Sequence, residues 1–201
     1  MLKYEKDYND LCYRVLNEGT KVYNERTGKI CHTVINHDFV YDIGKGEVPL
    51  LTNKQCFTVS AVAEILGYLR QYTNAQQFAD IGSPTWFSNA NENSSWLSNP
   101  HRLGDNDIGL CYGAVTGSQI HKIYNNLKEG IDDRGEIYQM WRPDTFHKAC
   151  LRPCAYEHIW SLLDGKLSLT VVQRSGDLPL GGQTPRYIVM YIRNSSKQGN
   201  S

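Results

Sequence analysis

The chain has 201 residues, a usual length for one domain, and 40% of them are hydrophobic, enough to form a core. Lys and Arg together number 21, as do Asp and Glu, and this balance argues against a protein that coats nucleic acid through surplus cations. The chain contains no run of about 18 apolar residues, and the charged start MLKYEKDYND does not resemble a signal peptide. We therefore expect a cytoplasmic protein whose six cysteines are reduced.

Apolar residues at helical spacing predict a first helix over residues 4–19, and NERTGK at 24–29 predicts a turn. β-branched and aromatic residues predict strands within 30–41. The clearest predicted helix covers 57–73, with Thr58 or Ser60 as its N-cap. Residues 82–109 are rich in Gly, Ser, Asn and Pro but hold large aromatic residues, which indicates a packed loop.

The second half of the chain predicts a helix over 118–129 and two strands over 155–163 and 166–174. Asp164-Gly165 between the strands is typical of a hairpin turn. Together these elements predict an α+β fold with one mostly antiparallel or mixed sheet. Beyond the short apolar run Tyr187–Ile192, the sequence RNSSKQGNS is polar and offers nothing to a core.

Cys154 is the first candidate for chemistry. Pro153 before it would hold the thiol at a rigid bend that enters a strand. Arg152 is adjacent and Arg174 would approach from the neighbouring strand, and a nearby cation stabilises the nucleophilic thiolate. A reactive cysteine is one interpretation of this pattern, and an ordinary core thiol, the usual outcome for a lone cysteine, is the other.

Two Cys and two His lie within residues 147–158, at His147, Cys150, Cys154 and His158. Their spacing is not that of a zinc finger, and there is no CxxC knuckle. We therefore predict no metal site, and interpret the four residues as buried thiols and partly buried imidazoles.

An anion site is the second candidate. In QRSGD at 173–177, Arg174 and Ser175 lie side by side at a strand end and suit a phosphate, with a polar exit from the strand as the alternative. Arg26 and Arg134 lie in glycine-containing loops, where each is either a surface charge or part of one anion site that the fold assembles. Glu64 lies between apolar neighbours, either as a buried acid or as an exposed residue at a helix boundary.

Eight segments in order resemble the thymidylate synthase family: YNERTG, PLLTNKQCF, VAEILGYLRQYTN, TW at 85–86, DIGLCYG, DDRGE, LRPC and DGKLSLTVVQRSGDLPLG. The resemblance covers roughly residues 4–182, and RPC followed by QRSxD and LG is its most specific part. It implies the family's mixed β-sheet layer with packed helices over residues 1–182, followed by a divergent tail over 183–201.

The resemblance implies a methyltransferase that converts dUMP to dTMP, with 5,10-methylenetetrahydrofolate as co-substrate and no metal. Cys154 matches the nucleophile that attacks carbon 6 of the uracil. Glu64 matches the carboxylate that organises water and proton transfers, and Tyr112 matches a tyrosine that assists proton removal. The remaining matches are the phosphate ligands Arg26, Arg174 and Ser175, and the positions near the folate ring, Trp86, Asp177, Leu180 and Gly181. Asp177 is also expected to contact the substrate.

Arg134 matches an arginine that family members donate across a two-fold interface, which implies a homodimer. The resemblance implies neither a membrane nor a specific nucleic acid as a partner.

Two of the chain's departures from the family bear most on function. After Tyr112-Gly113 it reads AVTGSQ and enters the next predicted helix directly, so a short loop is expected to be deleted. After Gly181 it reads GQTP, where the family has an Asn that recognises the pyrimidine edge. We interpret the chain as truncated at its C-terminus, with a frameshift as the hypothesis for the cause.

This interpretation leaves the activity of the chain itself open. One alternative is a non-catalytic nucleotide-binding remnant or a dimer partner of a full-length synthase. The weaker alternative is a pyrimidine nucleotide hydroxymethylase, which shares the fold.

Overall fold

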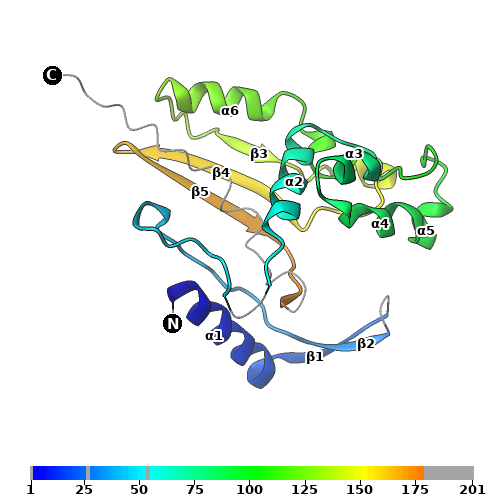
Figure 1. Ribbon diagram of the computed structural model, residues 1–201, viewed down its shortest axis with the longest axis horizontal. Coiled ribbons are helices and arrows are strands. Elements are labelled where there is room, and N and C mark those ends of the chain that lie inside the picture. Colours follow the sequence, from blue (N-terminus) through cyan, green and yellow to red (C-terminus); the bar gives the residue numbers. More distant parts are fainter. Residues whose placement is uncertain (1, 26–27, 53–54, 179–201) are drawn as a thin grey trace. The chain divides into compact units, whose positions relative to one another are not determined.

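The computed structural model describes residues 2–25, 28–52 and 55–178, in two compact units. The described part of the first unit comprises residues 2–25, 28–52, 55–56 and 177–178, and the second unit is described over 57–176. The first unit holds α1 (Lys3–Glu18), β1 (Thr20–Asn24), β2 (Lys29–Thr33) and the 3-10 helix η1 (Ile43–Lys45). Figure 1 labels the helices and strands of both units.

The second unit contains all the other elements. Its helices are α2 (Thr58–Leu69), α3 (Ala75–Asp80), η2 (Pro84–Trp86), α4 (Phe87–Asn91), α5 (Ser94–Leu97), η3 (Tyr112–Val115), α6 (Gln119–Lys128) and η4 (Pro143–Lys148). Its strands are β3 (Ile137–Gln139), β4 (Ala155–Leu163) and β5 (Lys166–Gln173). The predicted α+β class is confirmed, but the described strands form two antiparallel sheets instead of one.

In the first unit the predicted helix is confirmed as α1, which is followed by the β1–β2 hairpin. Strand structure was predicted as far as residue 41, but β2 ends at Thr33. The register explains the difference: Thr20, the first residue of β1, already pairs with Thr33, so β1 offers no partner to later residues. Tyr8 on α1 donates a hydrogen bond to the carbonyl of Leu178 at 3.0 Å, which ties residues 177–178 to this unit.

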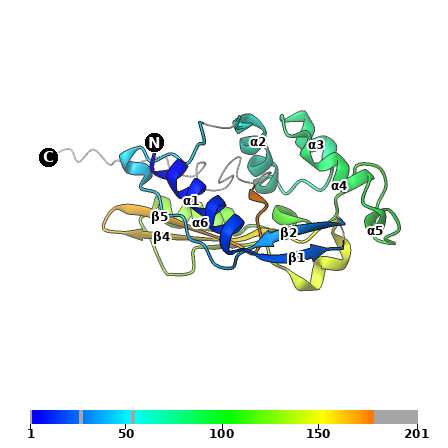
Figure 2. The same cartoon turned by 90° about the horizontal axis from the view of Figure 1, so that it is seen from below.

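The sheet of the second unit has the order β3-β4-β5, and α6 lies along β3 (Figure 1). The predicted β4–β5 hairpin is confirmed, and Figure 2 shows its two strands side by side along their length. Asp164 and Gly165 both have positive φ, 49° and 66°, as the two central residues of a type I′ turn require. β3 was not predicted, because three residues are too few to show a periodic pattern.

The predicted helix over 57–73 is shorter in the structure and is capped differently. α2 begins after Phe57 without a side-chain cap, so the predicted capping by Thr58 or Ser60 is wrong. Ser60 Oγ instead donates to Ser83 Oγ at 3.3 Å. The helix ends at Leu69 because Gln71 adopts φ 59° and closes a Schellman motif, in which Tyr72 N–H donates to Gly67 O at 3.0 Å.

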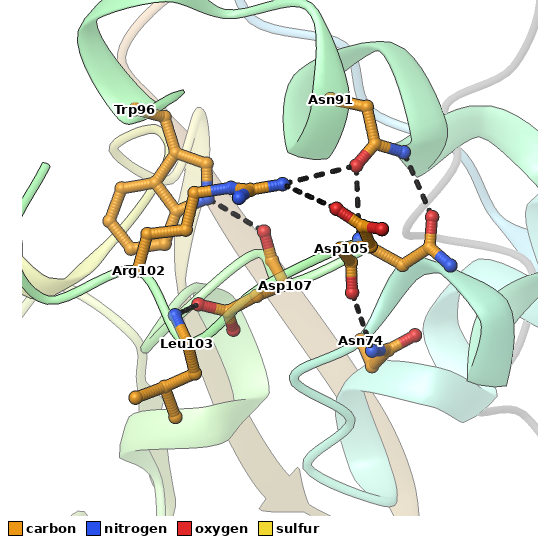
Figure 3. Close-up of polar contacts among 8 residues, drawn as sticks. Asn74, Asn91, Trp96, Arg102, Leu103, Asp105 and Asp107 are labelled. Carbon is orange, nitrogen blue, oxygen red and sulfur yellow. Dashed lines mark hydrogen bonds and ion pairs between the residues drawn. The ribbon is translucent and has the colours of Figure 1, made fainter. Parts of the chain in front are cut away.

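The segment 82–109 is packed, as predicted, and contains η2, α4 and α5. Trp96 is buried, and its indole N–H donates to the carbonyl of Asp107 at 2.6 Å (Figure 3). The Asn91 side chain accepts from Arg102 Nη2 at 3.4 Å and from Asn106 N–H at 3.0 Å, and donates to Asn106 Oδ1 at 2.8 Å. These bonds give several polar side chains partners within a segment whose composition is typical of a loop.

The stability of the second unit is expected to depend on pH through His158, a buried residue of β4. Burial lowers its pKa from 6.5 to about 4, so between these values the unfolded chain binds a proton that the folded chain does not. Stability is therefore full above pH 6.5 and falls as the pH decreases towards 4. Urea unfolding at pH 7.5 and pH 5.0 should show a loss of about 2 kcal/mol from this group.

His158→Gln should remove that part of the pH dependence, whereas the same change at exposed His121 on α6 should leave it in place. An unchanged pH profile in His158→Gln would contradict this assignment.

Candidate active site

Cys154 lies immediately before β4 and is half-buried. Its backbone N–H donates to Tyr112 Oη at 3.0 Å, and its carbonyl accepts from Arg174 N–H at 2.9 Å. The register of β4 against β5 shifts between Ala155 and Glu157, a β-bulge directly after the thiol. The predicted nucleophile is thus fixed on both sides by backbone hydrogen bonds.

Arg174 and Ser175 both approach the thiol of Cys154, as the sequence predicted for Arg174. Arg174 Nη2 lies 3.9 Å and Ser175 Oγ 3.7 Å from Cys154 Sγ. Arg174 Nη1 also donates to Ser175 Oγ at 3.4 Å. A cation and a hydroxyl donor next to a thiol stabilise the thiolate, the form that attacks carbon.

The guanidinium of Arg174 is held in place by the same segment that carries the thiol. Nε donates to the carbonyl of Pro153 at 2.9 Å, and Nη2 donates to that of Arg152 at 3.2 Å. The group also lies over the ring of Trp141, 5.7 Å from its centroid. These contacts leave a hydrogen on Nη1 that can donate to an anion.

Tyr112 has a strained backbone that brings its side chain to Cys154. It begins η3 with φ 45°, a left-handed conformation that is uncommon for a bulky residue. Its ring stacks on that of Tyr68 at a centroid distance of 4.4 Å and an angle of 4°. Strain of this kind persists only where the surroundings over-determine the conformation, and such residues concentrate at functional sites.

Tyr112→Phe is expected to lower the free energy of unfolding by about 1 kcal/mol, because Cys154 N–H loses its acceptor while the stacked ring remains. Urea unfolding followed by tryptophan fluorescence measures this, because all four tryptophans belong to the second unit. Tyr124→Phe on α6, where the side chain is exposed, should cost much less. If the two variants lost equal free energy of unfolding, the hydrogen bond between Cys154 and Tyr112 would contribute nothing to stability.

Glu64 is buried on α2, so the alternative of an exposed residue at a helix boundary is wrong. Thr85 Oγ1 donates to Glu64 Oε1 at 3.3 Å. Trp86, next in the chain, is buried with its ring edge-on to Tyr112 at 5.7 Å. Its indole N–H has no acceptor among the described residues. The buried carboxylate therefore bonds to the residue beside Trp86, and the Trp86 indole, with a donor to spare, lies in the aromatic cluster that contains Tyr112.

The remaining predicted residues are either exposed or outside the part of the chain that the structure describes. Arg134 is exposed in the loop before β3, and its guanidinium makes no hydrogen bond or ion pair with the described residues. Asp177 is exposed and belongs to the first unit. Arg26, Leu180 and Gly181 lie outside the described residues, as do the apolar run Tyr187–Ile192 and the whole of 183–201.

The Cys and His residues at 147–158 point to different partners. His147 packs against His101 at 4.9 Å between ring centroids, Cys150 contacts Cys111, and His158 packs against Tyr138. Within the described ranges no three His, Cys, Asp or Glu side chains are grouped as metal ligands. The same ranges contain no helix of the length and hydrophobicity needed to cross a membrane.

Sequence reasoning missed Tyr68 and Trp141, the aromatic supports beneath Tyr112 and Arg174. A signal existed for Tyr68, which follows Glu64 by four residues and so lies on the same face of α2. Trp141 carries no such signal, because it reaches Arg174 only through the pairing of distant segments.

Comparison with known proteins points to one family. The sequence profile described as thymidylate synthase matches residues 6–191. The chain is 50% identical over 186 residues to the thymidylate synthase of Glaesserella parasuis serovar 5 (strain SH0165), and 52% identical over 186 residues to that of Marinomonas sp. (strain MWYL1). It is 51% identical over 187 residues to that of Shewanella piezotolerans (strain WP3 / JCM 13877). Each alignment covers 88% of this chain and 66% of the relative's length.

Proposed function

Because this chain belongs to the thymidylate synthase family, we propose that it binds dUMP and methylates carbon 5 of the uracil, with Cys154 as nucleophile. The observation that carries the proposal is the approach of Arg174 and Ser175 to Cys154 Sγ, at 3.9 and 3.7 Å. Carbon 5 of uracil is a poor nucleophile. Addition of the Cys154 thiolate to carbon 6 turns carbon 5 into the nucleophilic carbon of an enolate. Covalent catalysis therefore removes the main obstacle to methylation, which is the low reactivity of carbon 5.

The other residues divide between binding and proton transfer. Arg174, Ser175 and Arg26 bind the phosphate, and Arg174 also keeps positive charge beside the thiolate. Tyr112 assists removal of the proton that carbon 5 must lose, and Glu64 organises the water and the proton transfers. The burial of Glu64 and the bond from Cys154 N–H to Tyr112 Oη support these roles.

When bound, 5,10-methylenetetrahydrofolate supplies the one-carbon unit and the reducing hydride. We assign its contacts to Trp86, Asp177, Leu180 and Gly181. The buried Trp86 N–H, which has no acceptor among the described residues, fits this role because a bound ring can provide one. Among the described residues, this donor is what supports the folate assignment.

The same proposal extends to organisation and location. We propose that residues 1–182 form the family's domain, that 183–201 form a divergent tail and that the protein is cytoplasmic. We also propose a homodimer in which Arg134 reaches the phosphate site of the partner subunit. The exposure of Arg134, and the lack of a partner for its guanidinium in the described chain, support this role.

A second candidate is a non-catalytic protein that binds the nucleotide or pairs with a full-length synthase. The observation that favours it is coverage, since the alignments leave about a third of each relative's length unmatched. Such a protein binds dUMP and forms no covalent bond to it.

Intact mass spectrometry with 5-fluoro-dUMP and 5,10-methylenetetrahydrofolate separates these candidates. Fluorine cannot leave carbon 5 as a proton does, so a competent site stalls as a covalent ternary adduct. We expect an adduct of the chain with both molecules. A soluble, folded chain that binds dUMP without forming the adduct would overturn the catalytic proposal. An adduct with 5-fluoro-dCMP in its place would indicate the hydroxymethylase alternative.

A further inference from the structure

Cys111 and Cys150 form a buried pair of thiols in the second unit, separate from the thiol of Cys154. Their sulfur atoms are 3.6 Å apart, and both residues belong to the hydrophobic core. The segments that carry them are joined by backbone hydrogen bonds. Leu110 N–H donates to Lys148 O at 2.7 Å, and Cys150 N–H donates to Ile108 O at 3.0 Å. The proximity of the sulfurs therefore follows from the pairing of two chain segments.

We propose that Cys111 and Cys150 are an oxidisable dithiol, which a peroxide converts to an intramolecular disulfide. A disulfide bond is about 2.05 Å long, so the two sulfurs must approach each other by about 1.5 Å from their present separation. The proposed methylation uses neither thiol, so this inference is independent of the proposed function.

The contacts of the pair assign different roles to its two sulfurs. The hydrogen bond to Cys111, together with burial, raises the pKa of Cys150. Burial also raises the pKa of Cys111, but the bond from Cys150 and backbone contacts at residues 150 and 151 outweigh it, and the net direction is down. This asymmetry favours Cys111 as the sulfur that reacts first, and an exchange of the two roles gives the same disulfide.

The reaction balances with one peroxide molecule. The Cys111 thiolate attacks an oxygen of the peroxide, the O–O bond breaks, and hydroxide leaves a sulfenic acid on Cys111. The Cys150 sulfur then attacks the Cys111 sulfur and gives up its proton, and the sulfenic oxygen departs as water. Overall the two thiols lose two hydrogens and are oxidised, while hydrogen peroxide is reduced to two waters.

The new bond would connect the two segments that support the proposed nucleophile. Cys111 directly precedes Tyr112, whose Oη accepts from Cys154 N–H, and Cys150 lies on the segment that leads to Cys154. The Cys111–Cys150 pair is thus a modification site next to the candidate active site around Cys154.

The test uses the full chain, reduced and then treated with about one equivalent of hydrogen peroxide under native conditions. Remaining thiols are blocked with N-ethylmaleimide, and the protein is digested without reduction for mass spectrometry. We expect a loss of about 2 Da and one cross-linked peptide pair that contains Cys111 and Cys150, reversed by dithiothreitol. We also expect no disulfide between either of these two cysteines and the other four.

Two variants provide controls. Cys150→Ser should abolish the loss of mass, and Cys31→Ser, which removes an exposed thiol of β2, should retain it. Cys111 and Cys150 both blocked by maleimide after peroxide treatment would overturn the proposal, as would a cross-link that contains Cys154. The peptide map is made on the unaltered chain, so it decides the question even if Cys150→Ser does not fold.

Discussion

Cys154→Ser is expected to abolish the covalent adduct with 5-fluoro-dUMP and to lower kcat of the proposed reaction by on the order of 10⁴-fold or more. Loss of the nucleophile acts on this scale in other covalent enzymes. A serine hydroxyl at this position keeps the shape of the side chain, but it is far less ionised than a thiol and has no dedicated base to activate it. Intact mass spectrometry measures the adduct, and isothermal titration calorimetry measures the affinity for dUMP.

The affinity for dUMP should remain within a few-fold in Cys154→Ser, because the anchors of the Arg174 side chain are untouched. These anchors are the carbonyls of Arg152 and Pro153, not the sulfur. Cys31→Ser serves as the control and should form the adduct normally, because Cys31 is an exposed residue of the β1–β2 hairpin. An adduct of undiminished yield in Cys154→Ser would mean that another thiol attacks the base, and would remove the basis of the proposed function.

The sequence predicted that Arg174 would approach Cys154 from the neighbouring strand. It did not predict the strand register that brings the two residues together. Counting outward from the Asp164-Gly165 turn in a regular hairpin places Cys154 opposite Ser175. The bulge between Ala155 and Glu157 shifts the pairing by one residue, so that Arg174 N–H donates to Cys154 O. The turn could be recognised locally, because both its residues accept positive φ. The bulge has no such signature in these residues, yet it decides which side chains meet at the thiol.

The contacts that the sequence did not predict depend on pairings between distant segments. Tyr112 lies 42 positions before Cys154, and its positive φ has no local cause in a Tyr-Gly pair. The end of α2 is similar: a Schellman motif normally calls for glycine, and here Gln71 takes the left-handed position. The resemblance to the family supplied the role of Tyr112, whereas periodicity and turn chemistry supplied only the elements around it.

Gly113→Ala is expected to destabilise the second unit by about 3 kcal/mol or more, the largest stability effect that we predict. A Cβ at Gly113 would lie 1.7 Å from the backbone carbonyl oxygen of Tyr68, which α2 holds in place. Neither partner is a flexible side chain, so the clash must displace η3 or unwind the end of the helix. The free energy of unfolding in urea, followed by tryptophan fluorescence, measures the loss.

Gly44→Ala is the matched control, because a Cβ there meets only the Asp42 carboxylate, at 3.2 Å, and this side chain can move. It should change stability by less than about 0.5 kcal/mol. The close approach of Gly113 to Tyr68 also sets the stacking of Tyr68 on Tyr112, and through Tyr112 the backbone of Cys154. Gly113→Ala should therefore also change the rate at which iodoacetamide alkylates Cys154 in chain that remains folded. If neither stability nor alkylation changed, η3 would be free to shift, and Tyr112 could not be the rigid support that its strained backbone indicates.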